Sequence, residues 1–336
     1  MADSKNPPRP NRKSKVVTDH ISPEKDPKIF ESVVTENIKK DLRQVQESVV
    51  RGVTSQENRI YWDRARLTVE GFRPIPWYIW RLSNFTLGKE GEIRTFGYGM
   101  VFALDKLIHL VGSDPEMCGS REKIDNPQEV IQSAKPDVFA AAAIIHSVCQ
   151  RFKDRQFKRI WRPILEEAIL RTRIGFSLGL RDKAFSSGRA MLAGFAGRAG
   201  LAIQIATGTL EQATEALERV ATGDSIQRIG IDIYSCEPLQ ISAMLLIACG
   251  CGRDAAYGVM SVASPDLAPE NSLTDTQKRW RSALLITEAI RTGDYALVNK
   301  GNWAHLGFQN EEDIFAFRSE IRQISRRGHT WGWLSE

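Results

Sequence analysis

The amino-acid sequence predicts an all-α protein with about a dozen helices. Three observations point to this fold class. Apolar residues recur every three or four positions through most of the 336-residue chain, which is the period of a helix face. Several of these stretches begin and end with residues typical of helix termini. Alternation of apolar and polar residues, which indicates a strand, is limited to one short candidate at residues 229–235.

The N-terminal part of the chain divides into two segments. Residues 1–28 are rich in proline and charged residues and contain the basic run Arg9–Lys15, so we expect a disordered basic tail. Residues 29–71 are expected to form amphipathic helices. The first of these carries an apolar stripe from Val34 to Val53 at three- and four-residue steps. Such a helix lies either on the body of its own protein or on a partner.

The middle of the chain, residues 72–264, opens on the aromatic stretch FRPIPWYIWRLSNF at 72–85. Pro74 and Pro76 interrupt this stretch, so we expect an irregular lead-in rather than a helix. Helical patterns then follow one another, each with its apolar residues on one face. These patterns cover residues 99–111, 135–152, 159–180, 188–208 and 239–248.

Further helices are predicted by residues typical of helix ends. Thr209 and Gln212 have the spacing of a capping box, and Gly223 follows the apolar pattern that they begin. Another helix is expected to end at Gly293. A last one opens with acidic residues, which favour the positive end of a helix dipole. These last two helices belong to residues 265–336, which we expect to form a C-terminal helical extension.

One glycine-rich stretch, GRAMLAGFAGRAGLAIQIATG, needs its own explanation. Gly194, Gly197 and Gly200 recur at three-residue intervals within it. The stretch lacks the Lys and Ser/Thr of a phosphate-binding loop, and its apolar residues follow a helical repeat. We therefore expect a buried helix whose glycines allow close helix contact, at roughly 1 kcal/mol of helix propensity each. On this basis Gly197→Leu should destabilise the protein by about 1–3 kcal/mol through overpacking.

The sequence gives little sign of metal, cofactor or nucleophilic chemistry. The loop GCGRDA at 250–255 fits a dinucleotide fingerprint but lacks the preceding strand that this fingerprint requires. Cys249 and Cys251 have one further cysteine upstream and no fourth ligand, and the histidines are isolated in spacing. Glu166 and Glu167 are adjacent, so they are expected on a solvated face rather than as an acid–base pair. We expect no catalytic residue, no metal and no cofactor.

The cellular location follows from the cysteines and from the apolar runs. Five cysteines, an odd number in apolar surroundings, predict buried and reduced thiols rather than disulfides. The N-terminus has no apolar segment of the kind that a secretory signal needs. The longest uncharged run, residues 238–252, is too short to span a bilayer. We therefore expect a cytoplasmic protein without a membrane span.

Three segments resemble the HDOD domain, a divergent branch of the HD hydrolase superfamily found in bacterial signalling proteins. Residues 160–180, IWRPILEEAILRTRIGFSLGL, resemble the family helix that opens with Trp and bears a metal-binding His in true HD enzymes. Residues 186–203, SSGRAMLAGFAGRAGLAI, resemble the following helix with its His-Asp pair. Residues 234–260 resemble a later helix pair that often carries another His. The resemblance covers residues 72–264 and implies an HD-like helical bundle.

The chain departs from this family at the positions of the metal ligands. Pro163 stands where the first His would be, Gly197 and Arg198 stand in place of His-Asp, and Pro238 replaces the later His. An arginine repels a divalent cation rather than binding it. The resemblance therefore implies a bundle without metal-dependent phosphohydrolase activity. It places a candidate ligand or partner site at Trp161, Gly197 and Arg198.

These observations predict a non-catalytic signalling, regulatory or scaffold protein that binds a partner protein through helix faces or a groove near Arg198. The alternative is a module that binds a small phosphorylated signal, such as a nucleotide, with Arg198 in the former active-site cavity. An active hydrolase with unrecognised ligands and nucleic-acid binding through the basic tail are further alternatives. Trp331 and Trp333 would form a docking tail if exposed, or pin the chain end if buried. We expect Arg198→Ala to leave the fold intact and to weaken binding.

Overall fold

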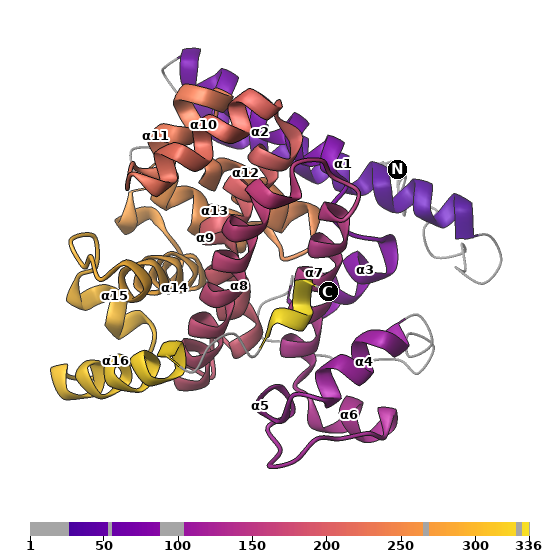
Figure 1. Ribbon diagram of the computed structural model, residues 1–336, viewed down its shortest axis with the longest axis vertical. Helices are drawn as coiled ribbons and strands as arrows, with labels where there is room; N and C mark the ends of the chain where they lie inside the picture. The colour runs from indigo at the N-terminus through magenta and orange to yellow at the C-terminus, as the bar shows by residue number, and fades with distance from the viewer. Residues whose placement is uncertain (1–26, 53–55, 88–103, 265–268, 327–330, 336) are drawn as a thin grey trace, which may run out of the picture.

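The computed structural model describes residues 27–52, 56–87, 104–264, 269–326 and 331–335 (Figure 1). Within these ranges all regular secondary structure is helical, which confirms the predicted all-α fold. The expectations for the tail before Pro27, for Val53, for Met100 and for Gly328 lie outside the described residues. The elements are α1 Pro27–Gly52, α2 Gln56–Phe72, α3 Trp77–Thr86, α4 Asp105–Gly112, α5 Pro115–Cys118, α6 Pro127–Ser133, α7 Pro136–Phe152, α8 Lys158–Arg181, α9 Ser187–Thr207, α10 Leu210–Ala221, α11 Ile226–Tyr234, α12 Pro238–Ala248, α13 Arg253–Ala263, the 3-10 turn η4 Glu270–Ser272, α14 Asp275–Thr292, α15 Lys300–His305, α16 Glu311–Arg326 and the 3-10 turn η5 Gly332–Ser335.

Helix α9 is the central helix of the bundle, and it contains the glycine-rich stretch. All of its residues except Arg198 and Thr207 are buried. Helices α7, α8, α12 and α14 pack around it, and α8 runs beside it through the middle of the molecule (Figure 1). A helix that is apolar on every side is expected in such a position. The prediction of a buried helix in place of a phosphate loop is therefore confirmed.

The same helix satisfies the length and composition of a membrane span. In the part of the chain that the structure describes, Ser187–Thr207 passes this test alone, and 89% of its apolar window is buried inside the protein. The pair Ile226–Tyr234 and Pro238–Ala248 passes only if the two helices, bent by 87°, are counted as one span. Burial of this kind is typical of a core helix, which passes the test because its neighbours are apolar side chains.

The glycines of α9 bring helix backbones into direct contact. A Cβ atom added at Gly194 would overlap the carbonyl oxygen of Arg171 on α8, and one at Gly200 would overlap that of Pro238 on α12. The predicted close contact is confirmed for Gly194. The packing around Gly197 is looser. A Cβ added there would have Cδ1 of Leu284, the end of a flexible side chain, as its nearest neighbour at 3.3 Å. Side-chain atoms of this kind give way more easily than a carbonyl of a neighbouring helix.

The expectation of an irregular lead-in at residues 72–85 is wrong over most of its length. Helix α3 begins at Trp77, directly after Pro76, and continues to Thr86. The two prolines lie ahead of the helix, where the missing N–H costs nothing because the first helical N–H groups have no intrahelical acceptor. Ile79 and Leu82 then place an apolar face against the core. Only the short connection after Phe72 is irregular.

The one strand candidate, residues 229–235, is a helix instead. Helix α11 runs from Ile226 to Tyr234. Its buried residues Ile229, Gly230 and Tyr234 have the spacing of a helix face. The isoleucines of this stretch also recur at every second position, which is the spacing of a strand. Gly230 lies against the ring of Pro238, where a Cβ would overlap the ring. Packing against α12 therefore decides the conformation of this stretch.

Both ends of the described chain pack on a single core. On α1, Val34, Leu42 and Val45 are buried, and the helix contacts α2 and α12. The first reading of this helix, in which it lies on its own protein, agrees with these contacts. At the other end Trp331 is 1% exposed and meets the ring of Phe176 edge to face at 5.3 Å. Trp331 thus pins the chain end.

A buried carboxylate begins helix α12. Glu237 is 7% exposed and forms a capping box with Gln240, whose side chain accepts a hydrogen bond from the Glu237 backbone N–H at 3.0 Å. Burial raises the pKa of Glu237 to about 8. The folded protein therefore holds a proton on Glu237 that the unfolded chain releases near pH 4.5. The contribution of this group to stability is full below that pH and is lost as the pH rises through about 8.

This linkage gives a pH-dependent prediction for Glu237→Gln. The glutamine keeps the cap geometry and never ionises, so the variant should gain stability relative to wild type between pH 5 and pH 9. With about 1.4 kcal/mol per unit of pKa difference, the relative gain is on the order of a few kcal/mol. Thermal unfolding at both pH values measures the gain, with the exposed Glu218→Gln as the control. A gain that does not change with pH contradicts a buried, protonated Glu237.

Candidate functional site

The structure places the three candidate residues in two different regions. Trp161 is buried near the start of α8, where its Nε1 donates to the carbonyl oxygen of Gln156 at 2.8 Å and its ring packs on Phe152 at 5.0 Å. Gly197 and Arg198 lie on α9 beside Arg171 of α8. Arg171 follows Trp161 by ten residues, which places it about 15 Å from Trp161 along the axis of α8. The structure thus groups Gly197 with Arg198 and places Trp161 elsewhere.

Pro163 also lies apart from the other positions at which metal ligands were expected. It is exposed on the first turns of α8, whereas Pro238 is buried at the start of α12 against Gly200. Among the described residues, no three His, Cys, Asp or Glu side chains gather in a way that could hold a metal ion. The five cysteines are all free and buried, as predicted.

Arg198 is held by a carboxylate from another helix. Its Nη2 lies 2.6 Å from Oε1 of Glu288 and its Nη1 lies 2.9 Å from Oε2, so the pair is bidentate. The same Nη1 donates to the carbonyl oxygen of Gly197 at 3.0 Å. The side chain of Arg198 is only 13% exposed. A bidentate arginine–carboxylate pair is among the strong charge-assisted contacts of proteins.

This pair belongs to a larger ionic network that joins α8, α9 and α14. Arg171, whose side chain is 3% exposed, donates from Nε to Glu288 at 2.9 Å and from Nη1 to Glu167 at 2.6 Å. Glu167 in turn accepts two hydrogen bonds from Arg291, at 2.6 and 2.9 Å. We call the five side chains Arg198, Glu288, Arg171, Glu167 and Arg291 the ionic ladder. Three cations alternate with two carboxylates along it.

The electrostatics of the ionic ladder keep its carboxylates ionised. Burial acts to raise the pKa of Glu288, but Arg171 and Arg198 outweigh it and hold the pKa below its usual value. Burial likewise acts on Glu167, and Arg291 and Arg171 lower the pKa of that carboxyl. Burial and the nearby Arg171 lower the pKa of Arg198, although an arginine remains charged at any physiological pH.

Arg198 therefore has a structural role that the sequence analysis did not predict. A phosphate group could reach its guanidinium only by displacing Glu288 or by sharing the donors that Glu288 occupies. Arg198→Ala stays predicted to leave the fold intact, but with a loss of stability, because Glu288 would keep Arg171 as its only partner. Glu166 is exposed and pairs with Arg162, as expected of a solvated face, whereas Glu167 is a member of the ladder.

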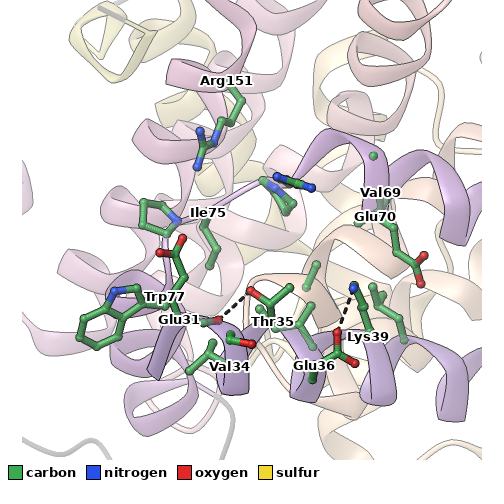
Figure 2. A pocket seen from close by; sticks show the side chains of 18 of the residues that line it. Glu31, Val34, Thr35, Glu36, Lys39, Val69, Glu70, Ile75, Trp77 and Arg151 are labelled. Atoms are coloured by element: carbon green, nitrogen blue, oxygen red, sulfur yellow. Dashed lines mark hydrogen bonds and ion pairs between the residues drawn. The ribbon is translucent and has the colours of Figure 1, made fainter. Parts of the chain in front are cut away.

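A large hollow in the described part of the chain lies elsewhere, between α1 and α2. This α1–α2 groove has a volume of about 970 Å³ and also reaches the turn before α3 (Figure 2). Its floor is apolar and includes Val34, Leu42, Val69 and Ile75. Leu67 lines it with a side chain that is 57% exposed. The groove thus offers apolar surface to a ligand from outside the bundle.

The groove is lined by three carboxylates, those of Glu31, Glu36 and Glu70, and by three cations, those of Lys39, Arg73 and Arg151. Lys39 pairs with Glu36 at 2.9 Å within α1, and Glu70 pairs with Arg66 at 2.7 Å within α2. Arg151 of α7 reaches the groove from the opposite wall (Figure 2). Arg73 follows α2 in a left-handed backbone conformation, with φ of 50°. The guanidinium groups of these two arginines contact no carboxylate among the described residues. Neither arginine belongs to a sequence motif, so neither was predicted as a site residue.

Comparisons of the chain with protein-family models, with curated proteins and with solved structures found no match. The resemblance to the HDOD domain therefore stays a prediction drawn from the sequence. What the protein can bind is therefore argued from two features of the structure. One is the closed ionic ladder around Arg198, and the other is the open α1–α2 groove with its apolar floor.

Proposed function

We propose that this protein is a non-catalytic signalling, regulatory or scaffold protein of the bacterial cytoplasm that recognises a partner protein. On this proposal the helical core is HDOD-like, and recognition takes place in the α1–α2 groove. The observation that carries the proposal is the groove itself, which combines about 970 Å³ of space with an apolar floor and two arginines without a carboxylate partner among the described residues. Apolar surface with a charged margin is typical of a protein-recognition site.

The chemistry of the groove defines the segment that would fill it. Apolar side chains of the partner would cover Val34, Leu67 and Ile75, in the way that an amphipathic segment fills a hydrophobic groove. An acidic side chain at one end of the segment would meet Arg73 and Arg151. The partner is therefore proposed to present a short amphipathic segment with at least one carboxylate.

The alternative function, binding of a phosphorylated signal beside Arg198, has less support. Glu288 already occupies the guanidinium of Arg198 in a bidentate pair, and Arg171 adds a second bond to the same carboxylate. Nucleic-acid binding through Arg9–Lys15 concerns residues outside the described part of the chain. The groove is therefore the preferred site of recognition.

Photo-crosslinking in bacterial cells tests this function. A photoreactive residue in place of Leu67 should capture a discrete partner polypeptide. The same residue in place of Leu180, which is 51% exposed on α8, should not. The double variant Arg73→Gln/Arg151→Gln should weaken the capture by about tenfold, since two charge pairs at a partly exposed interface contribute about 0.2–1 kcal/mol each and their loss also slows association.

The control for the charge effect is Arg121→Gln, because Arg121 is an exposed arginine outside the groove. Capture through position 67 should survive this change. The proposal is wrong if positions 67 and 180 capture the same set of proteins, or if no discrete protein is captured at position 67.

A further inference from the structure

A second cavity lies between α2 and the C-terminal end of α9. Its volume is about 320 Å³, within the range of small-molecule sites. Gln204, Thr207 and Gly208 line it from α9, and Tyr234 lines it from α11. We call it the α9–α11 cavity. A Cβ at Gly208 would lie 2.8 Å from the Tyr234 ring, so the glycine lets this ring approach the end of α9.

Two of the residues that line this cavity each carry a buried polar atom without a hydrogen-bond partner among the described residues. They are Oε1 of Gln204 and the hydroxyl of Tyr234. Gln204 is 2% exposed and Tyr234 is 6% exposed, so water reaches neither freely. The amide of Gln204 is fixed in orientation, because its Nε2 donates to the carbonyl oxygen of Cys236 at 2.7 Å. An unpaired buried acceptor costs about 1–3 kcal/mol, which a ligand with a donor group would recover.

The rim of the cavity carries two positive charges. Arg64 enters it from α2 and Arg155 from the loop between α7 and α8, where its guanidinium also lies 5.3 Å from the ring centre of Phe72. Neither guanidinium forms an ion pair within the described residues, and no carboxylate is among the residues that line the cavity. The formal charge of the lining is thus +2.

We propose that the α9–α11 cavity binds a small phosphate monoester whose organic part carries an N–H or O–H donor. Arg64 and Arg155 would hold the phosphate, whose charge of about −1.5 to −2 at neutral pH matches the two guanidinium groups. Oε1 of Gln204 would accept the donor at the other end of the ligand, and the Tyr234 hydroxyl would donate to a ligand oxygen. The carbonyl groups at the end of α9 favour a donor at that end. None of the residues that line this cavity belongs to the ionic ladder, and the cavity adjoins the α1–α2 groove at Leu67 and Gly71 of α2.

Calorimetric titration of the full chain tests the proposal with defined probes. The monoesters are AMP, GMP, CMP and glucose 6-phosphate, and the comparison compounds are adenosine, inorganic phosphate and glutamate. At least one monoester should bind more than tenfold more tightly than each comparison compound. Adenosine lacks the phosphate, inorganic phosphate lacks the organic part that would present a donor to Gln204, and glutamate supplies carboxylates in place of phosphate.

The variants assign the binding to the cavity. Arg64→Gln/Arg155→Gln should weaken monoester binding by at least about tenfold, since a charge-assisted hydrogen bond contributes about 1.5–3 kcal/mol. Tyr234→Phe should weaken it several-fold without loss of the fold, because the hydroxyl makes no bond within the described residues. Arg121→Gln should leave the affinity unchanged. The proposal is overturned if no monoester binds, if glutamate binds as tightly, or if the cavity variants bind like wild type.

Discussion

Replacing Gly200 by alanine is expected to lower the unfolding free energy by at least about 3 kcal/mol. The added Cβ would overlap the carbonyl oxygen of Pro238 and lie 2.8 Å from the hydroxyl oxygen of Ser242. That hydroxyl donates to the carbonyl oxygen of Ala196 at 2.6 Å and accepts from the Gly200 N–H at 3.1 Å, so it ties α12 to α9. The two helices would have to separate, and these bonds would be lost with the packing.

The matched control is Gly197→Ala on the same helix. Its Cβ would meet only the side-chain atoms of Leu284 and Arg171, at 3.3 and 3.5 Å. The helix propensity of alanine exceeds that of glycine by about 1 kcal/mol, which should offset this mild crowding. The longer side chain of Gly197→Leu should still cost about 1–3 kcal/mol. Urea denaturation of both alanine variants gives the comparison, and equal stabilities would show that α9 and α12 do not touch at Gly200.

Replacing Arg171 by methionine is the second change with a large expected effect. Arg171 is the central cation of the ionic ladder, and its loss leaves the partly buried carboxylates of Glu167 and Glu288 with fewer partners. Removal of one partner from a buried ion pair costs about 3–5 kcal/mol. We therefore expect a loss of about 3 kcal/mol in the unfolding free energy at pH 7, because both carboxylates keep one other arginine.

Arg162→Met supplies the comparison for this variant. Arg162 lies on the same helix and pairs with Glu166, but both side chains are more than 40% exposed, so the loss should stay below about 1 kcal/mol. A double variant, Arg171→Met/Glu167→Gln, should recover part of the lost stability, because it removes a carboxylate that has lost one of its partners and leaves unpaired only Arg291, whose side chain is 37% exposed. Equal losses of unfolding free energy for Arg171→Met and Arg162→Met would contradict a stabilising role of the ionic ladder.

The parts of the fold that the sequence predicted are those decided by neighbouring residues. The Thr209–Gln212 capping box forms as expected, and Gly293 adopts φ of 81° at the end of α14. The apolar repeat of α9 likewise predicted its burial. Helix α3 was missed because two prolines suggest a break, although a helix can begin directly after them. Helix α11 was missed because its isoleucines fit either period.

The candidate site was less predictable because its contacts join distant parts of the chain. The pair Glu167 and Arg171 has a spacing of four and was open to detection on one helix. Glu288, which decides the role of Arg198, lies 90 residues further along the chain, and nothing local connects the two. The same holds for Gly200 and Pro238, whose contact depends on how α9 crosses α12. Residue type alone showed that a glycine or an arginine was present, but not what it faces.

The most direct test compares two sites for one partner. Once crosslinking at position 67 has identified the partner segment, its dissociation constant is measured with wild type, Arg73→Gln/Arg151→Gln and Arg198→Gln, each under conditions where the variant is folded. We expect the groove variant to bind about tenfold more weakly and Arg198→Gln to bind like wild type. The opposite result, with binding lost at Arg198 and kept at the groove, would contradict recognition in the α1–α2 groove and return the site to the ionic ladder.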